Sequence, residues 1–216
     1  MTEGLSGESR SLDAYRQLEE MIVTMDLAPG ELVSEQQLAE KLGLGRTPVR
    51  EAVQRLAVEH LVDIMPRRGL RIAPIDLRKQ VRLLETRRAL EILVARRAAD
   101  RADRVARTQF SHLAAQFRAN GRQSYDTFLR LDRAFNNAVA EACDNEFAVE
   151  ALMRLHGLSR RFWHYYSGHE QDLQDVAEMH AAVASAIAEG DSDTAEQAVR
   201  AHMDYIHRFT LAILKD

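Results

Sequence analysis

Apolar residues recur every three or four positions through most of the chain, a spacing that predicts amphipathic α-helices. The first such segment runs from Leu12 to Met25, and Pro29-Gly30 ends it. Two short apolar segments, Leu61–Met65 and Leu70–Ala73, instead flank the turn Pro66-Arg-Arg-Gly69 and predict a two-stranded hairpin. The pattern therefore predicts a mainly α protein with one small β element.

A segment in the N-terminal third predicts two short helices separated by a glycine turn. Ser34 followed by Gln37 has the spacing of a capping box, which starts a helix. The run Gly43–Gly45 ends that helix, because glycine adopts the left-handed conformations found at helix ends. Thr47 is expected to cap the second helix and Pro48 to occupy its first position. Such a helix-turn-helix places its second helix in the major groove of DNA.

Arg46, Thr47 and Arg50 lie outside the apolar stripe of the second helix, at its leading end. Recognition helices contact base edges with this end, and arginine can donate two hydrogen bonds to guanine O6 and N7. The turn of the hairpin adds Arg67 and Arg68, a basic tip typical of a wing. Three helices and a basic hairpin together predict a winged-helix DNA-binding domain.

The charge distribution agrees with this prediction. The chain carries 29 Lys and Arg against 33 Asp and Glu, a net charge of −4 that argues against indiscriminate nucleic-acid binding. Between Gly43 and Pro74, however, six arginines stand against three acidic residues. The basic charge is therefore concentrated on the proposed reading surface.

Other features of the sequence bear on where the protein works. Residues 1–10 are polar, without the apolar core of a signal peptide, and predict a flexible N-terminus before a DNA-binding domain at residues 11–74. No apolar run approaches about 18 residues, so no membrane span is expected. The single Cys143 cannot form an internal disulfide, and its place on an apolar helix face predicts a buried thiol. A cytoplasmic location is expected.

Short motifs in the predicted winged-helix domain resemble the N-terminal domain of the GntR family of bacterial transcription regulators. They are Pro29-Gly30-Glu31, Leu38-Ala39, Arg46-Thr-Pro-Val-Arg-Glu-Ala52 and Arg68-Gly69. The resemblance covers about residues 12–74. It implies that Arg46, Thr47, Arg50, Arg68 and Gly69 contact DNA. Position 45 departs from the family, which usually has serine or threonine where this chain has glycine, so no side-chain role is assigned there.

Residues 75–216 are expected to form an all-α bundle. The apolar pattern predicts six helices, at residues 77–101, 104–119, 124–143, 146–163, 172–189 and 193–214. Turn signals at Asn120-Gly121 and Glu189-Gly190-Asp191 mark two of the connections. Short connections make successive helices antiparallel neighbours. The predicted fold is thus a winged helix-turn-helix with a two-stranded wing, followed by a six-helix bundle.

Four side chains of the predicted bundle have donor atoms suited to a divalent cation. Asp132 and Asn136 are four residues apart and share a helix face, and His180 and His202 lie on the fifth and sixth helices. Two imidazoles, a carboxylate and an amide oxygen suit zinc, nickel, iron or manganese. Histidines on helices commonly have a purely structural place, so the spacing alone leaves both interpretations open.

The bundle also resembles the FCD ligand-binding domain of one GntR subfamily, in its smaller, VanR-like branch. The resemblance rests on Arg87-Arg-Ala-Leu-Glu91, Asp132-Arg-Ala-Phe135, Glu178-Met-His180 and Ala201-His202. It implies a metal ion held by Asp132, His180 and His202, with a small organic acid as effector. Where the family has a fourth ligand, a histidine, this chain has Asn136, a poorer neutral donor. Three interpretations stay open: a weakened site, a preference for harder metals, or direct binding of an organic ligand without metal.

Arg87 has two candidate roles. Its guanidinium could clamp the carboxylate of an anionic effector through two hydrogen bonds. It could equally pair with Glu91, four residues further along the same helix.

The sequence as a whole predicts a ligand-responsive, DNA-binding transcription regulator, a repressor released by a small carboxylic acid. A homodimer is expected, because two winged helices read a short inverted repeat in double-stranded DNA with twice the contact surface. The alternatives are a regulator that senses the metal alone, a metal-dependent hydrolase, and a helical domain that only dimerises. No H-E-x-x-H, paired Glu-x-x-His or nucleophile motif supports the hydrolase, so no enzyme activity is expected.

Overall fold

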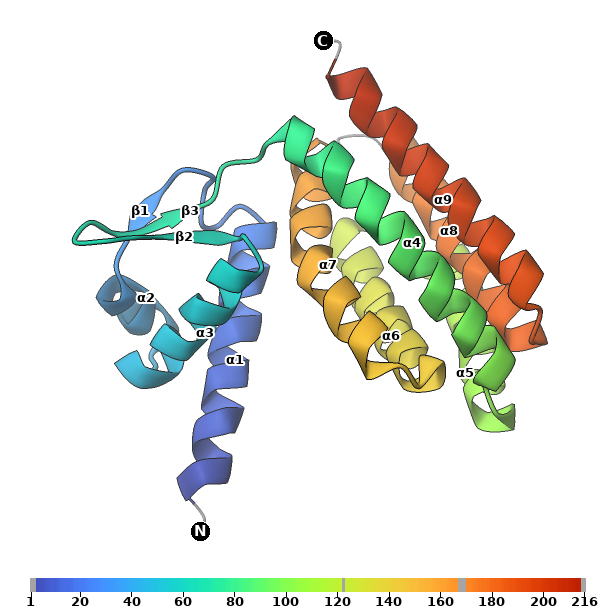
Figure 1. The fold of residues 1–216 in the computed structure, drawn as a ribbon, viewed down its shortest axis with the longest axis horizontal. Coiled ribbons are helices and arrows are strands. Elements are labelled where there is room, and N and C mark those ends of the chain that lie inside the picture. Colours follow the sequence, from blue (N-terminus) through green and yellow to red (C-terminus); the bar gives the residue numbers. More distant parts are fainter. Residues whose placement is uncertain (1–2, 122, 167–169, 215–216) are drawn as a thin grey trace. The chain divides into compact units, whose positions relative to one another are not determined.

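The computed structural model describes residues 3–121, 123–166 and 170–214, drawn as a ribbon in Figure 1. Over these residues the chain forms nine helices and three short strands, which confirms a mainly α fold. Contacts divide the chain into two compact units. Unit 1 contains Met1–Asp76 together with Arg154–Tyr166, and unit 2 contains Leu77–Met153 and Ser167–Asp216. Every helix in the described ranges is too short or too polar to cross a membrane.

Unit 1 contains three N-terminal helices and a small antiparallel sheet (Figure 1). The helices are α1 (Glu3–Val23), α2 (Glu35–Leu42) and α3 (Arg46–Val58), and the strands are β1 (Leu32–Val33), β2 (Val62–Met65) and β3 (Gly69–Ile72). The strand order is β1-β3-β2, so the expected two-stranded wing gains a third strand. The pattern missed β1 because two residues are too few to show an alternating period.

The helix boundaries in unit 1 confirm one predicted cap and correct another. Ser34 and Gln37 form the expected capping box of α2, and Gly43 ends that helix in a left-handed conformation with φ of 64°. Helix α3, however, begins at Arg46 with Gly45 as its N-cap, so Thr47 lies inside the first turn and does not cap it. The expected cap failed because the backbone of Gly45, two residues before Thr47, already adopts the extended conformation of an N-cap.

Helix α1 also starts earlier than expected. The apolar pattern predicted a first helix from Leu12, and α1 is helical from Glu3 onward. Polar residues can extend a helix once a packed apolar stripe has formed its nucleus. Here that stripe includes the buried side chains of Ala14, Leu18 and Ile22.

The core of unit 1 joins α1, α2, α3 and the sheet, and a segment from later in the chain completes it. Leu158 packs against this cluster from helix α7 (Glu146–Tyr166). A Cβ added to Gly157 would lie only 2.8 Å from Cδ1 of Leu61, so the absent side chain allows α7 to approach closely. The second half of α7 therefore belongs to the same core as the N-terminal helices.

Two arginines of α7 make polar contacts inside unit 1. Arg160 forms an ion pair with Glu19 of α1, and both side chains are largely buried. The Nη2 atom of Arg161 donates a hydrogen bond of 3.1 Å to the carbonyl oxygen of Pro74. Burial lowers the pKa of Arg161 to about 10, and the guanidinium still remains protonated at neutral pH.

The described residues of unit 2 form helices joined by short turns. Its other helices are α4 (Leu77–Arg101), α5 (Arg104–Asn120), α6 (Tyr125–Cys143), α8 (Glu170–Glu189) and α9 (Ser192–Ile213). Together with α7 they confirm the six predicted helices, each within about three residues of its expected ends. The expected apolar stripe of α6 is buried at Phe128, Phe135 and Val139, and the thiol of Cys143 is buried as expected.

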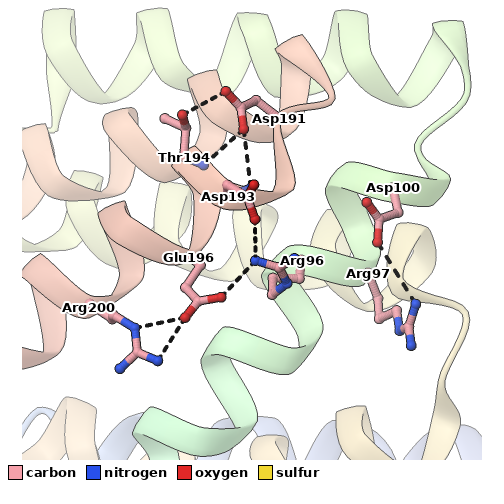
Figure 2. Close-up of polar contacts among 8 residues, drawn as sticks. All are labelled: Arg96, Arg97, Asp100, Asp191, Asp193, Thr194, Glu196 and Arg200. Atoms are coloured by element: carbon pink, nitrogen blue, oxygen red, sulfur yellow. Dashed lines mark hydrogen bonds and ion pairs between the residues drawn. The ribbon is translucent and has the colours of Figure 1, made fainter.

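Helices α4 and α9 pack along each other, and charged residues tie their edges together (Figure 2). The Nη1 atom of Arg96 lies 2.7 Å from both Asp193 and Glu196, and Glu196 also pairs with Arg200. Asp191 caps α9 by accepting hydrogen bonds from two backbone N–H groups, which lowers the pKa of its carboxyl. This packing connects the helices that carry Arg87 and His202.

Candidate nucleic-acid interface and buried histidine site

The leading end of α3 carries three exposed polar side chains. Arg46, Thr47 and Arg50 point outward from the first turn, while Val49 and Val53 are buried on the opposite face of the helix. The apolar stripe therefore fixes which way the polar side chains face. The arrangement is the one expected of a helix that presents its N-terminal residues to base edges.

The wing ends in a short exposed turn. Arg67 and Arg68 join β2 to β3, and both are exposed. Arg67 adopts a φ of 63°, and Gly69 follows with a φ of 90°. A Cβ at Gly69 would lie 2.9 Å from the carbonyl oxygen of Val33, so β1 can pair with β3 only because residue 69 lacks a side chain. Gly69 thus shapes the wing through its backbone.

Both arginines at the start of α3 already have partners on α2. The Nη2 atom of Arg46 donates a hydrogen bond of 2.7 Å to Oε1 of Gln36. The Nε atom of Arg50 lies 3.4 Å from the carboxylate of Glu35. Sequence reasoning missed Glu35 and Gln36, because contacts across the turn between two helices leave no periodic signal. Their only sequence signal is the presence of polar residues in the first turn of α2.

In unit 2, three of the expected metal ligands come together and are largely buried. Asp132, His180 and His202 are 7–8% exposed and come from α6, α8 and α9. The Nε2 atom of His180 lies 3.3 Å from Oδ1 of Asp132, and the two imidazole rings have centroids 4.6 Å apart. The rings of three phenylalanines, Phe117, Phe128 and Phe135, surround His180 with centroids 5.1–5.8 Å away. The site is therefore a small polar cluster inside an aromatic shell.

The hydrogen bond of His180 to the backbone fixes where its protons lie. Its Nδ1 atom lies 2.8 Å from the carbonyl oxygen of Val176, and a carbonyl oxygen can only accept. Nδ1 therefore carries a hydrogen, and Nε2 faces the carboxylate of Asp132. In this tautomer Nε2 and the Asp132 carboxylate both present lone pairs, as the donors of a metal site do. A backbone carbonyl bonded to the far nitrogen is also the usual environment of a metal-bound histidine.

His202 differs from the other residues of the cluster in the hydrogen bonding of its ring. No group in the described ranges forms a hydrogen bond with its buried Nε2 atom. Burial, together with the positive charges of His180 and Arg87, lowers the pKa of His202 well below its ordinary value. The imidazole is therefore neutral at physiological pH, with a nitrogen available to a ligand.

Asn136 and Arg87 lie beside this cluster in different roles. The Nδ2 atom of Asn136 donates a hydrogen bond of 3.0 Å to Oδ1 of Asp132, so the amide orients the carboxylate. Arg87 pairs with Glu91, which was one of the two roles predicted for it. Its Nε atom donates a hydrogen bond of 3.2 Å to the carboxylate. Arg87 is itself buried on α4, at 8% exposed, and its positive charge is one of the causes that lower the pKa of His202. Although Asp132, His180 and His202 lie near one another, their positions do not form a ready metal site, and no other three His, Cys, Asp or Glu side chains of the described residues form one.

Comparison with protein families gives two matches. Residues 10–72 match the family described as bacterial regulatory proteins, gntR family, and residues 82–205 match the FCD domain. The chain is 30% identical to the HTH-type transcriptional repressor RspR of Escherichia coli (strain K12) over 193 residues, 89% of this chain and 85% of that protein. It is 24% identical to the HTH-type transcriptional repressor GlaR of the same organism, over 89% of this chain and 92% of that one.

The fold also has solved counterparts. Escherichia coli McbR/YncC aligns with a TM-score of 0.80 and 18% sequence identity, over 95% of this chain and 98% of that chain. At this level of identity the likeness concerns the fold alone. It extends over both the winged-helix region and the helical bundle.

Proposed function

The chain belongs to the GntR family of bacterial regulatory proteins and carries an FCD domain, and from this premise we propose that a small organic acid controls its binding to DNA. The protein is a DNA-binding transcription regulator, and we propose that it represses its target genes until the acid binds in unit 2. The observation that carries this proposal is the buried cluster of Asp132, His180 and His202, with the charge of Arg87 beside it. Structural cores rarely leave a buried polar atom unpaired, whereas ligand sites use such atoms.

The proposed DNA-reading residues are the exposed side chains of unit 1. Arg46, Thr47 and Arg50 would contact bases and phosphates in the major groove, and Arg67 and Arg68 would contact the adjacent backbone. Replacing Arg46 by alanine should weaken binding to the preferred site by about 1–3 kcal/mol and relax the base preference there. A fluorescence anisotropy titration with unchanged preference over random DNA would refute this role.

We further propose a homodimer that reads a short inverted repeat. One winged helix offers few base contacts, and two-fold pairing doubles them in the symmetric arrangement that most DNA-binding dimers use. Analytical ultracentrifugation of the free protein and of its complex with a selected duplex tests this proposal. Two chains per duplex are expected, and a single chain bound at full affinity would contradict it. A regulator that acts on bacterial DNA works in the cytoplasm, which is the location that we propose.

We also propose that unit 2 binds a divalent metal ion, because the donor atoms of the buried cluster are of the types that such ions prefer. A carboxylate and two imidazoles from Asp132, His180 and His202 suit zinc, nickel, iron or manganese, and Asn136 holds the carboxylate in place. A bound divalent cation would supply positive charge and open coordination positions for a carboxylate ligand. Metal analysis of untagged protein, purified without chelator and then soaked with each metal, should give about one ion per chain. A stoichiometry near zero for every metal would show that the proposed metal site is wrong.

The effector proposal has its own test. Wild-type protein bound to a duplex selected from a randomised pool is titrated with a panel of small mono- and dicarboxylic acids. At least one acid should raise the dissociation constant for DNA, and His202→Ala should abolish that response while leaving DNA affinity in the absence of acid unchanged. The exposed His112 provides the matched control, since His112→Ala should respond as wild type. If no acid changes DNA binding, the proposed control by a small organic acid is wrong.

Arg87 is proposed to bind the acid through its guanidinium. The ion pair with Glu91 holds the guanidinium in place and leaves other N–H groups for a carboxylate. Arg87→Lys keeps the charge but loses the fork-shaped pair of donors. This variant should therefore require a higher acid concentration than wild type for the same release of DNA.

A further inference from the structure

Arg46, one of the proposed base-contacting residues, is held by a series of two hydrogen bonds that involve residues of the neighbouring helix α2. Arg46 donates from Nη2 to Oε1 of Gln36 at 2.7 Å, and Nε2 of Gln36 donates to Oε1 of Glu40 at 3.0 Å. All three residues are exposed. We propose that Gln36 and Glu40 are positioning residues for Arg46 and that they help determine which base the protein prefers. This inference rests on the proposed role of Arg46 in reading DNA.

The donor and acceptor roles in these two hydrogen bonds follow from the chemistry of Glu40, Gln36 and Arg46. The carboxylate of Glu40 can only accept hydrogen bonds, so it must face the amide nitrogen of Gln36. The amide oxygen of Gln36 is then turned away from Glu40, toward the guanidinium of Arg46. Because a guanidinium can only donate, the amide oxygen is the one atom of the Gln36 side-chain amide that can hold it. Glu40 therefore sets which end of Gln36 meets Arg46.

The contact leaves Arg46 free to bind DNA. A guanidinium has five N–H donors, and the hydrogen bond to Gln36 uses one of them. The remaining donors can form the paired hydrogen bonds that distinguish guanine from other bases. Holding a long, flexible side chain before binding reduces the rotamer freedom that it loses in the complex. It also restricts the positions from which the guanidinium can reach a base.

The neighbouring arginine has a different kind of partner, which sharpens the role of Gln36. Arg50 faces the carboxylate of Glu35, whose negative charge offsets part of its attraction to DNA. Gln36 is neutral, so Arg46 keeps its full charge while its position is fixed. The contact between Gln36 and Arg46 therefore affects which sequence the protein prefers. The contact between Glu35 and Arg50 affects how tightly the protein binds any DNA.

Helix α2 does not depend on this chain of hydrogen bonds for its own stability. Its N-terminus is capped by Ser34 and Gln37, and it is anchored in the core by Leu38 and Ala39. Substitutions at positions 36 and 40 should therefore leave the unfolding midpoint of the protein unchanged. This separates a positioning role from a structural one.

The test uses the full-length protein and a randomised double-stranded DNA pool. Sequences selected by wild type define a preferred duplex, and anisotropy then gives the ratio of dissociation constants for a scrambled duplex and the preferred one. Arg46→Ala should lower this ratio by about fivefold or more. Gln36→Ala should lower it by about twofold or more, and the double variant should match Arg46→Ala alone, because coupled residues are not additive.

Two variants of Glu40 and one control complete the design. Glu40→Ala removes the group that orients the amide of Gln36 and should reduce discrimination, whereas Glu40→Gln, which keeps an acceptor but can also donate, should reduce it less. Gln17→Ala is the matched control, since Gln17 is an exposed glutamine on α1 that bonds Asp13 four residues away. It should bind as wild type.

The outcomes separate this inference from the DNA-binding role itself. If Arg46→Ala leaves discrimination unchanged, Arg46 does not read DNA and both fail together. If Arg46→Ala loses discrimination but Gln36→Ala does not, only the positioning role is wrong. Additive effects of Gln36→Ala and Arg46→Ala would mean that Gln36 contacts DNA by itself, which also overturns the inference. A lowered unfolding midpoint in Gln36→Ala would assign the residue a structural role instead.

Discussion

The guanidinium carbon of Arg55 lies 3.8 Å from the centre of the Tyr15 ring, so a cation–π contact joins the recognition helix α3 to α1. The same two side chains share a third partner. The hydroxyl of Tyr15 donates to Glu59 at 2.8 Å, and Nε of Arg55 donates to the same carboxylate at 3.2 Å. This closed triangle anchors the C-terminal end of α3, opposite to the end that carries Arg46.

Tyr15→Phe should destabilise unit 1 by about 1–3 kcal/mol, because the largely buried carboxylate of Glu59 loses a hydrogen-bond donor. Urea unfolding followed by circular dichroism measures the change. Tyr165→Phe is the matched control, since Tyr165 is 56% exposed and should lose little stability. Equal stability of Tyr15→Phe and wild type would show that the triangle does not anchor α3.

The carboxyl of Glu59 should make the stability of unit 1 depend on pH. Burial raises its pKa above the ordinary value of 4.5, against the smaller lowering effects of Tyr15 and Arg55. A carboxyl whose pKa is higher in the folded state favours folding when protonated. Its contribution to the free energy of unfolding therefore falls as the pH rises from about 4.5 through the folded-state pKa. Glu59→Gln should remove this slope from unfolding curves measured at a series of pH values, and an unchanged slope would contradict the raised pKa.

Breaking the pair between Glu19 and Arg160 should be strongly destabilising. Their side chains are 8% and 16% exposed, so removing either partner leaves a largely buried charge without compensation. A loss of about 3–5 kcal/mol is expected for Glu19→Ala or Arg160→Ala, with partial recovery in the double variant. Arg97→Ala is the control, because its 3.9 Å contact with Asp100 is exposed. Urea unfolding that gives additive losses in the double variant would show that the two residues act independently.

Glu35→Gln should strengthen binding to every DNA sequence. The carboxylate faces Arg50 at 3.4 Å, and its removal leaves that guanidinium uncompensated near the phosphates. The gain should be at most about fivefold, because exposed pairs of this kind are worth up to about 1 kcal/mol. Anisotropy titrations should also show a steeper dependence on salt concentration. A gain limited to the preferred duplex would mean that Glu35 acts on base recognition instead.

Gly69→Ala should destabilise unit 1 by distorting the wing. The new Cβ would lie 2.9 Å from the carbonyl oxygen of Val33, at a φ of 90° that side chains rarely adopt. Gly30→Ala is a close control, since Gly30 has a φ of 85° but no atom within 4 Å of its added Cβ. Both variants should lose about 1–2 kcal/mol from the backbone conformation, and Gly69→Ala should lose more. Equal stabilities in urea unfolding would show that the wing adapts to the side chain.

The sequence was most informative where structure depends on near neighbours. The capping box of Ser34 and Gln37 and the left-handed Gly43 were predicted because each involves residues within one helical turn. The two residues of β1 were missed because their pairing with β3 joins positions far apart in the chain. Thr47 was wrongly expected to cap α3, because its residue type suits a cap but Gly45 takes that place.

In the candidate sites, too, the features set by near neighbours in the sequence were predicted, and those set by contacts between helices were not predicted from residue spacing. The exposure of Arg46, Thr47 and Arg50 followed from the apolar stripe of α3. Their partners on α2, in contrast, depend on how the two helices cross. The approach of Asp132, His180 and His202 was expected from family resemblance, since three separate helices carry them. Spacing along one helix could not have brought them together.

Helix α7 has a consequence for anyone who wishes to recombine this regulator with other sensors. A gene fusion cut after Asp76 would leave behind Gly157, Leu158 and Arg160, which complete the packing and charge balance of the N-terminal core. A transplanted reader would then expose the surfaces of Leu61 and Glu19 that α7 covers, and Glu19 would lose its partner Arg160. The portable unit is therefore discontinuous in the gene, and a working chimera must bring the segment Arg154–Tyr166 with it.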